Sequence, residues 1–348
     1  MELQLKNIGM IKEANVKIDG LTVIAGENDT GKSTVGKALV LYLKYFIQLK
    51  KISLLDKESE VFNGLKKNFI SSNLLVDILF SKQLSKKGYI ELILDKKSLK
   101  LDIIDNKIIY DNFLENGLES VDIYFPIMIE SPLVWNFNKF LNQISLIQSR
   151  LSSFGDNIEM ETPFLIGDIH FKLLTKNQNK SNNYYIEKNI IDIINGSFTQ
   201  DDLGNFFFMR GKDRIELINT ATGIKAFGIL QVLSQNNYLN KETVLILDEP
   251  EVHLHPKWQL EMAKVIVELV KNGVQIVVNS HSPYMIEALK RYSEVENIES
   301  KTNFYLAEDG YIKQIENSNP LTLEKTFEKL SEPFDIFDEM DSKRLQNG

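Results

Sequence analysis

The stretch that begins at Gly26 and ends at Thr34 constrains the fold of this chain more than any other part of its sequence. An apolar run, 21–25, precedes the stretch, and a helical pattern with one apolar face follows it. Strand, glycine-bounded loop and helix form the context in which G-x-x-x-x-G-K-S binds phosphate; the alternative is a glycine-rich turn that binds nothing. The expected phosphate-binding residues are Gly26, Glu27, Asn28, Asp29, Thr30, Gly31, Lys32, Ser33 and Thr34.

The parts of this loop have distinct expected roles. The glycines let successive backbone N–H groups turn toward the phosphates, and the helix N-terminus adds its positive end. Lys32 is expected to bind the β- and γ-phosphate oxygens, and the Ser33 hydroxyl is expected to bind Mg²⁺. The sequence therefore predicts a site for a nucleoside triphosphate and its magnesium ion.

Composition excludes several other classes of protein. The chain has 348 residues, enough to bury one large core or two modest ones. It has no cysteine, which excludes disulfides, thiolate metal sites and a catalytic cysteine. No window approaches the roughly 18 unbroken apolar residues of a membrane span, and the strand-like start leaves no room for a signal peptide. We therefore expect a cytoplasmic protein with no membrane partner.

The net charge bears on nucleic-acid binding. Forty Lys and Arg residues against 48 Asp and Glu residues give a formal net charge of −8. This balance argues against a chain coated in nucleic-acid-binding surface. A local basic groove stays open, and so does a groove completed by a partner.

Hydrophobic patterns divide the chain into three expected parts. The first, 1–132, carries the phosphate loop and an antiparallel meander. The second, 133–196, is mostly helical, broken near Gly155 and Pro163, and lacks the sustained heptads of a coiled coil. The third, 197–348, alternates buried strands with helices, which indicates a parallel sheet covered on both faces. The expected strands are 2–8, 14–18, 21–25, 89–94, 99–104, 107–110, 121–129, 206–210, 214–218, 243–247, 274–279, 303–307 and 311–315. The expected helices outside the second part are 32–50, 224–235, 256–271, 283–291 and 321–330, with a polar, helix-prone stretch at 56–87.

Two acids, Asp248 and Glu249, directly follow the buried run 244–247. Carboxylates at the C-terminal end of such a strand lie where nucleotides bind in α/β folds. Asp248 is expected to hold Mg²⁺, directly or through water, and Glu249 to orient and deprotonate the attacking water. The alternative is a solvent-facing acidic turn, which the presence of the phosphate loop disfavours.

Two further groups extend this pattern. His281 ends another buried strand and is expected to reach the γ-phosphate, although a lone histidine is usually structural. Thr222, Gly223 and Lys225 lie at a helix start, where a hydroxyl and a glycine form a second phosphate-binding tip. An ordinary helix cap is the alternative for the threonine and glycine. These residues support a nucleotide site because of the order of the four groups along the chain, which is phosphate loop, helix start, acidic pair and histidine.

That order resembles the ABC-type ATPases over nearly the whole chain. Within them the chain is most similar to the SMC-like and overcoming-lysogenization-defect (OLD) branch, seen in prokaryotic repair and phage-defence ATPases. The resemblance implies ATP and Mg²⁺ as ligands. It also implies an α/β, P-loop NTPase fold of ABC type, with a mixed central sheet, a meander lobe and a short helical insertion in place of a coiled coil. The residues that carry it are the loop 26–34, the run Asp248-Glu249-Pro250-Glu251-Val252-His253-Leu254-His255-Pro256, and Asn279-Ser280-His281-Ser282-Pro283.

The family also implies a head-to-head homodimer that sandwiches two ATP molecules. In it, Thr222 and Gly223 of one subunit touch the γ-phosphate bound by Lys32 of the other. Here the signature reads Ala-Thr-Gly-Ile-Lys, which departs from the family's Ser-Gly-Gly-Gln type. A family glutamine that helps hold Mg²⁺ has no obvious counterpart, and Glu130 stands at the expected strand end.

The end of the chain departs from the full OLD pattern, which includes a TOPRIM nuclease. The 67 residues that follow His281, 282–348, are too few for that domain. The tail acids, from Asp335 to Asp341, lie in one short polar run that is typical of a solvated helix or chain end. No nuclease is therefore expected in this chain.

Several other residues invite functional readings that we do not favour. His253 and His255 beside Glu251 could hold a metal, but in the family that loop faces the partner subunit. His170 has no expected partner and is expected to be structural. The two tryptophans, expected to pack rather than to stack on bases, are Trp135 and Trp258.

Three functions compete. The first is an ATP-switched sensor in phage defence that controls a separately encoded effector, a nuclease or toxin, with 133–196 as the docking surface. The second is a repair or chromosome-handling ATPase that acts on DNA directly, and the third is a transporter's nucleotide-binding subunit. The Glu-Pro-Glu…Leu-His-Pro run and the unusual signature count against transport. The absent coiled coil and the acidic charge count against direct DNA handling, although DNA stays open as a partner.

Overall fold

The computed structural model describes residues 1–53, 87–94, 97–104, 107–109, 124–153, 163–178 and 184–346. These residues form two compact units. Unit 1 comprises Met1–Ile123, Val277–Glu287 and Glu299–Gly348, and unit 2 comprises Tyr124–Ile276 and Ala288–Ile298. The helix-prone stretch expected at 56–87, apart from Lys87, and the break expected at Gly155 lie outside the described residues.

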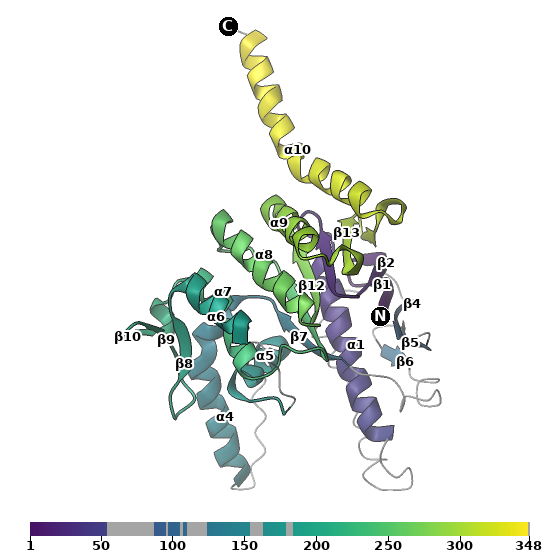
Figure 1. Cartoon of the computed structure of the whole chain (residues 1–348). Coiled ribbons are helices and arrows are strands. Elements are labelled where there is room, and N and C mark those ends of the chain that lie inside the picture. The colour runs from purple at the N-terminus through teal and green to yellow at the C-terminus, as the bar shows by residue number, and fades with distance from the viewer. Residues whose placement is uncertain are drawn as a thin grey trace. The chain divides into compact units, whose positions relative to one another are not determined.

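Unit 1 is built on a mixed sheet with the strand order β6-β5-β4-β1-β2-β14-β13-β3-β12 (Figure 1). Strand β1 pairs antiparallel with β2 and β4, whereas β3 pairs in parallel with β13 and β14 with β2. The expected antiparallel meander is confirmed as β4, β5 and β6. The bounds are β1 Glu2–Ile8, β2 Ile11–Lys17, β3 Leu21–Ala25, β4 Lys87–Leu94, β5 Lys97–Ile104, β6 Lys107–Ile109, β12 Gln275–Ser280, β13 Thr302–Glu308 and β14 Tyr311–Lys313.

Helix α1, Lys32–Ser53, begins at the phosphate-loop lysine and is buried on the face expected from the sequence. That apolar spacing returns to one side of a helix at every turn, which gives α1 a continuous face to pack. The residues predicted for this face are fully buried: Val35, Ala38, Leu39, Tyr42 and Leu43. The core of unit 1 therefore holds α1 in place directly behind the loop.

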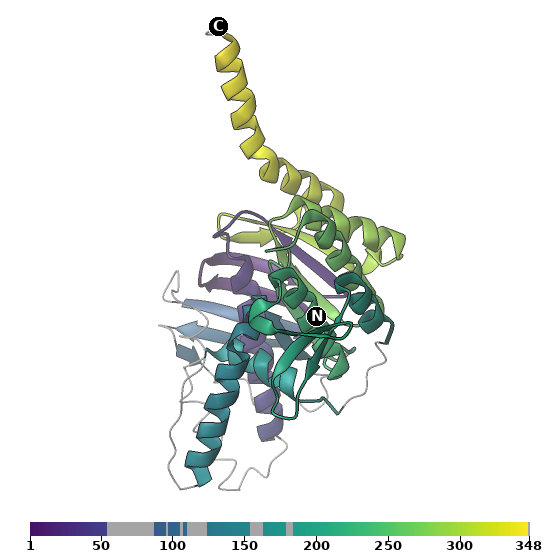
Figure 2. The same ribbon diagram turned by 90° about the vertical axis from the view of Figure 1, so that its left-hand side faces the viewer.

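Helix α10, Asn319–Gln346, is much longer than the helix expected at 321–330. It packs against β13 near its start, and its later turns extend away from the rest of unit 1 (Figures 1 and 2). The acidic run after Pro333, expected to be a solvated helix or a chain end, is part of this helix. The helix continues through the proline and this run with Phe337 and Met340 exposed.

Unit 2 contains a parallel strand pair, a helical group and a small antiparallel sheet with the order β10-β9-β8. Its strands are β7 Phe125–Ile129, β8 Ser197–Gln200, β9 Phe206–Arg210, β10 Asp213–Glu216 and β11 Thr243–Asp248. Its α-helices are α4 Asn138–Ser153, α5 Phe164–Leu174, α6 Tyr184–Ile194, α7 Thr222–Gln235 and α8 Pro256–Lys271, and 3-10 turns lie at Pro132–Phe137 (η2) and Leu217–Asn219 (η3). Helix α9 is Pro283–Val295. The strand expected at 214–218 ends at Glu216 because η3 follows, and β8 was not predicted.

An aromatic cluster joins η2 to the small sheet. The indole of Trp135 stacks on Phe198 with a centroid distance of 5.1 Å and meets Phe206 edge-on at 5.0 Å. Phe198 contacts Phe208 at 5.4 Å. Such aromatic pairs add roughly 0.5–1.5 kcal/mol each beyond the burial of their area. The expectation that Trp135 packs inside the protein is confirmed.

His170 has a partner, contrary to expectation. Its Nε2 lies 3.3 Å from Nδ2 of Asn138, and the imidazole is buried. Burial lowers the pKa of His170, which favours a neutral ring that accepts a hydrogen bond. Asn138 also accepts a hydrogen bond from the Phe206 amide at 3.4 Å, so this pair links α4 and α5 to β9.

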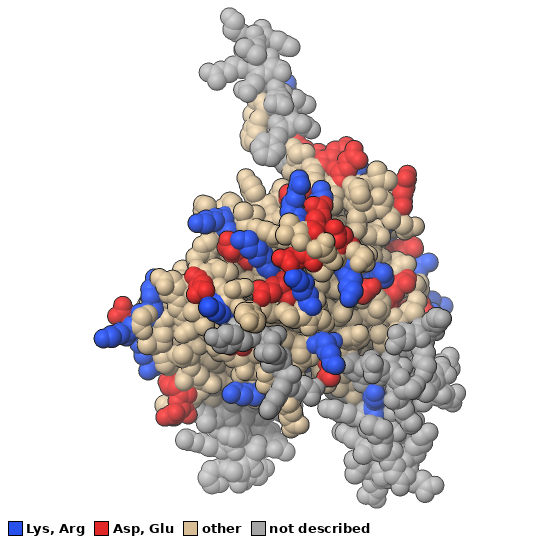
Figure 3. All heavy atoms as spheres, viewed as in Figure 1, with Lys and Arg blue, Asp and Glu red and all other residues tan. Residues whose placement is uncertain are grey.

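The surface carries both signs of charge. On the face drawn in Figure 3, Lys and Arg are interspersed with Asp and Glu. None of the helices that the structure describes has the length and hydrophobicity needed to cross a lipid bilayer.

Candidate nucleotide site

The glycines at the two ends of the phosphate loop are required by its geometry. Gly26 has a φ of 154°, and a Cβ there would lie 2.4 Å from the carbonyl oxygen of Ala307. Gly31 has a φ of 93°, and its Cβ would lie 3.0 Å from Cγ1 of Ile11. A larger residue at either position would be strained and would meet its neighbours. The pattern read from the sequence therefore matches a real steric demand.

Lys32 is the centre of this loop. Its side chain is buried, and Nζ donates to the carbonyl oxygens of Gly26 at 3.0 Å and Glu27 at 2.5 Å. The Thr30 hydroxyl also donates to the Glu27 carbonyl, at 2.9 Å. The loop is thus closed around its own ammonium group. Phosphate oxygens carry full charge, so they are stronger partners for this ammonium than neutral carbonyls.

The start of α1 favours an anion. The first turn of the helix contains no acidic residue, so no side chain competes for its positive end. The Thr34 amide donates to the Gly31 carbonyl at 3.0 Å, which continues the turn of the loop into the helix. Ser33, expected to bind Mg²⁺, lies in this first turn and is half-buried.

Strand β12 lies beside β3 in the sheet of unit 1. The phosphate loop follows β3, and His281 follows β12. Asn279 and Ser280 are fully buried, whereas His281 is half-buried. The Ser282 hydroxyl accepts from the Met285 amide at 3.4 Å and caps α9, which fixes where the chain turns after the histidine. Contact of His281 with the γ-phosphate stays a prediction.

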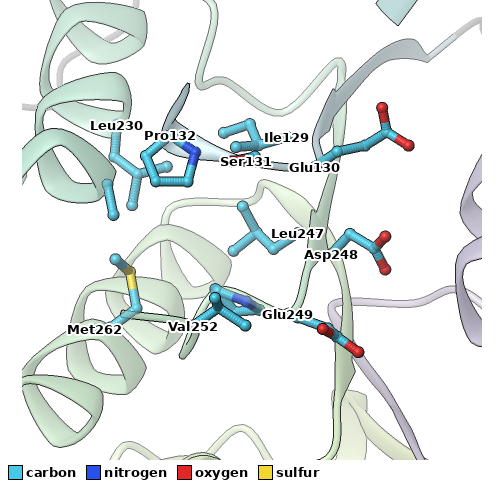
Figure 4. A pocket seen from close by; sticks show the side chains of 12 residues that line it. Ile129, Glu130, Ser131, Pro132, Leu230, Leu247, Asp248, Glu249, Val252 and Met262 are labelled. Atoms are coloured by element: carbon cyan, nitrogen blue, oxygen red, sulfur yellow. The ribbon is translucent and has the colours of Figure 1, made fainter. Parts of the chain in front are cut away.

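The acids of unit 2 are brought together by the pairing of β7 with β11. The two strands are parallel, and Leu247 pairs with Ile129. The next residues, Asp248 and Glu130, therefore leave adjacent strands at the same edge. Figure 4 shows the carboxylates of Glu130, Asp248 and Glu249 pointing to one side. Glu130 thus lies at the strand end expected from the sequence, beside Asp248, for which magnesium binding stays a prediction.

Glu249 has a strained backbone. Its φ is 49°, in the left-handed region that residues other than glycine rarely adopt. Such a conformation costs of order 1–3 kcal/mol and persists where the surrounding structure imposes it. The Glu249 carbonyl accepts from the Val252 amide at 3.0 Å, and the Glu251 carbonyl from the Leu254 amide at 2.9 Å. These turn hydrogen bonds hold the loop that carries Glu249 in this conformation.

An apolar pocket lies behind the acids (Figure 4). Most of the side chains that line it are apolar, and the carboxylates of the acids point away from it. The other residues that line it are Ile129, Ser131, Pro132, Ala226, Leu230, Leu247, Pro250, Val252 and Met262.

The signature segment starts α7 two residues earlier than expected, at Thr222. Ala221 is the N-cap residue and provides no side-chain hydrogen bond. Gly223 is buried, and a Cβ on it would lie 3.1 Å from Cδ2 of Leu254 and 3.3 Å from Cε3 of Trp258. Glycine therefore lets the helix start approach the loop after Glu249. Sequence reasoning assigned this glycine to phosphate binding and missed its packing role, because the contact joins residues far apart in the chain.

Lys225 was expected to bind nucleotide, but the structure gives its ammonium a protein partner. The side chain is buried, and Nζ donates to Oδ1 of Asn136 at 2.7 Å. The carbonyl oxygen of Lys225 accepts from Nε1 of Trp135 at 3.0 Å. Burial lowers the pKa of Lys225. The nucleotide binding expected of Lys225 from the sequence stays a prediction.

The histidines of the acidic loop do not form a metal site with Glu251. His253 and His255 are exposed, and Nδ1 of His255 accepts from the Lys257 amide at 3.3 Å, which caps α8. Across the described part of the chain, no group of three or more His, Cys, Asp or Glu side chains could hold a metal alone. Mg²⁺ is usually bound by one or two carboxylates together with substrate phosphates, and within unit 2 the carboxylate oxygens of Asp248 and Glu130 fit that chemistry.

A glycine-bounded loop around a buried lysine, with acids at the end of a parallel strand, defines a P-loop ATPase. A family model described as "AAA ATPase domain" matches residues 109–286, more than half of the chain. The chain belongs to this family and is an ATPase. The matched region includes Glu130, Asp248, Glu249 and His281.

Individual proteins are similar to the chain at low identity. The Septu protein PtuA of Bacillus thuringiensis is 22% identical over 327 residues, which cover 82% of this chain and 72% of that protein. Among solved structures, an Smc head bound to the C-winged helix domain of ScpA is 15% identical, with a TM-score of 0.46 over 90% of this chain and 96% of that one. The SMC head domain from Thermotoga maritima is 14% identical, with a TM-score of 0.42 over 90% and 98% of the two chains.

Replacing Lys32 tests the phosphate loop. In Lys32→Ala, we expect ATP affinity to fall by about 10- to 100-fold, because a charged hydrogen-bond donor to phosphate contributes roughly 1.5–3 kcal/mol. Titration with a fluorescent ATP analogue measures this change. Lys37→Ala, which removes a lysine one turn further along α1, should bind ATP like the unmodified protein. Equal ATP affinity in Lys32→Ala would overturn the assignment of the loop.

Replacing Glu249 tests the chemistry. Glu249→Gln keeps the size of the side chain but removes its ability to accept a proton. We expect ATP binding to persist and turnover to fall by roughly 10²–10⁴-fold, the usual contribution of a general base. Phosphate release measures turnover, and Glu261→Gln, which removes a carboxylate from the surface of α8, is the control. Turnover at the unmodified rate would mean that the base lies elsewhere, with His281 as the next candidate.

Proposed function

We propose that this ATPase is a dimeric switch that controls a separately encoded effector in prokaryotic phage defence. The observation that carries this proposal is the similarity to the Septu protein PtuA, which extends over 82% of the chain. The sequence motifs count against transport and leave two functions, phage defence and DNA repair. This similarity favours defence.

The proposed dimer is an ATP sandwich. Thr222 and Gly223 begin α7, a helix of 14 residues whose first turn contains no acid, so its N-terminus suits a phosphate. In the sandwich this tip serves the nucleotide bound by the partner subunit. ATP binding would then close the dimer, and hydrolysis assisted by Glu249 would open it.

The active chemistry beyond ATP hydrolysis is assigned to another protein. Each carboxylate that we assign a chemical role, Glu130, Asp248 and Glu249, is used for ATP and its metal. Nuclease sites with two metals need several converging carboxylates. Within the described residues no second cluster of this kind is found. An ATPase of this design would act through an effector.

The surface proposed for the effector lies on the helical group that follows β7. Leu133 and Phe137 of η2, together with Phe140 and Ile147 of α4, are each more than two-fifths exposed. Large apolar side chains that gather on a surface favour a protein interface. These residues begin three positions after Glu130, so the surface is continuous in the chain with the acids of the site.

The second candidate is an ATPase that acts on DNA directly. The observation in its favour is a basic hairpin, where Arg210 and Lys212 are exposed at the turn between β9 and β10. Two acids offset the positive charge of this hairpin. A carboxylate oxygen of Asp201 lies 3.6 Å from the guanidinium of Arg214, and one of Glu216 lies 4.0 Å from it. The net charge of −8 also opposes DNA binding.

Co-purification from the native operon tests the proposal. We expect Glu249→Gln protein, held with ATP and Mg²⁺, to elute as a dimer that carries the product of a neighbouring gene. Phe140→Glu should lose that product because it places a charge in the apolar surface. The control is Tyr284→Glu, which changes a similarly exposed aromatic residue on α9 (61% exposed, against 58% for Phe140).

The same preparations are then incubated with plasmid DNA. We expect no cleavage by the ATPase alone and, with a nuclease effector, cleavage only by the complex. An ATPase that purifies without a partner and binds plasmid in an ATP-dependent way would favour the direct DNA-handling function instead. Cleavage by the ATPase alone would contradict the assignment of all chemistry to ATP.

A further inference from the structure

The strongest unexplained feature is Lys225, a buried residue whose ammonium group donates to Asn136, an exposed residue of η2. The side chain is 4% exposed, and its acceptor is the neutral amide oxygen of Asn136. No carboxylate partner for it is found among the described residues. Lys172 is the matched contrast, since it is 8% exposed but forms an ion pair with Asp168 on the same helix.

Burying most of a lysine without an acidic partner has a cost, which is reduced here because the ammonium group reaches the exposed Asn136. Buried lysines are normally paired with an acid, because desolvation disfavours the charged form. A methionine at position 225 would fill similar space without this cost. No ion pair among the described residues accounts for this lysine, so its bond to Asn136 is the feature to explain.

The contacts of Lys225 join two parts of the ATPase site. Asn136 lies in η2, which begins at Pro132, two residues after Glu130. Lys225 lies in the first turn of α7, three residues after Thr222. The second bond, from Trp135 Nε1 to the Lys225 carbonyl, ties the same two segments through a side chain that is 1% exposed. We call Trp135, Asn136 and Lys225 the signature clamp.

The opposite side of the helix start is held as well. Gly223 lies against Leu254 and Trp258, which follow Glu249 in the acidic loop and in α8. The ring of Trp258 also meets Phe227 of α7 edge-on, with a centroid distance of 5.6 Å. The first turn of α7 is therefore fastened to the segments that follow both Glu130 and Glu249.

We propose that Lys225 is a positioning residue that passes a change at Glu130 to Thr222 and Gly223 through the signature clamp. A metal–nucleotide complex that pulls on Glu130 would move η2, and the bonds to Asn136 and Trp135 would carry this movement to the start of α7. Lys225 itself does not touch the nucleotide. The inference rests on the proposed role of Thr222 and Gly223 in the dimer, and it concerns the ATPase without any effector.

Kinetics of matched variants separate positioning from nucleotide binding. In Lys225→Met we expect the Kd for ATP to stay within about twofold, while kcat falls by about tenfold or more, because small displacements of positioned groups cost rates of this order. Asn136→Ala should behave in the same way. The double variant should be no slower than either single variant, since both remove one interaction. Lys139→Met removes an exposed lysine nearby and is the control.

The two tryptophans of the chain provide a direct signal, because each contacts the start of α7. Trp258→Phe leaves Trp135 as the single emitter. We expect ATP with Mg²⁺ to change its emission, and this change to disappear when Lys225→Met is added but to remain when Lys139→Met is added. Thermal unfolding of each variant confirms that it is folded.

Two results would overturn the proposal. A Kd for ATP raised tenfold or more in Lys225→Met would make Lys225 a nucleotide ligand. An unchanged kcat together with an unchanged Trp135 response would make it a purely structural residue. These measurements use the isolated ATPase, so failure to find an effector would not affect them.

Discussion

The parallel pairing of β7 with β11 is the constraint on which the acid half of the site depends. A shift in this register would displace the end of one strand along the other, so Glu130 and Asp248 would no longer follow paired residues. With Leu247 opposite Ile129, the strands end together, and Glu130 and Asp248 emerge at one edge. The inner residues of both strands are buried, so apolar packing on both faces holds the pair in the sheet. The positions of the acids are thus set by hydrophobic packing within the strands, away from the carboxylates themselves.

The loops that follow these strands convert that edge into an ordered arrangement. The backbone of Glu249 is left-handed, and the turn hydrogen bonds hold the loop in this conformation. The close approach of Gly223 to Leu254 and Trp258 then brings the start of α7 against the same loop. In unit 1 the comparable constraint is steric, because the carbonyl of Ala307 leaves no room for a side chain on Gly26. In each unit, the candidate site residues therefore include backbone positions that few residues tolerate.

Much of this was predictable from local sequence patterns. The bounds of β1, β3, β9 and α8 follow from apolar spacing and turn residues, and the phosphate loop follows from its motif and flanks. What could not be predicted depends on contacts between distant segments. The burial of Lys225 against Asn136 and the packing of Gly223 on Trp258 leave no local signal. Strand β8 is too short for its alternation to stand out, and α10 continues through Pro333, where a proline normally predicts an end.

The central claim is that Glu130 and Asp248 act together on the magnesium ion of ATP. The most direct measurement is the Mg²⁺ concentration needed for half-maximal ATP hydrolysis by Glu130→Ala, with Glu242→Ala, at the opposite end of β11, as the control. Removing one of the oxygen ligands around a divalent ion weakens the site, so we expect the requirement to rise by about tenfold or more. An unchanged Mg²⁺ requirement in Glu130→Ala, with ATP hydrolysis intact, would contradict this account of the site.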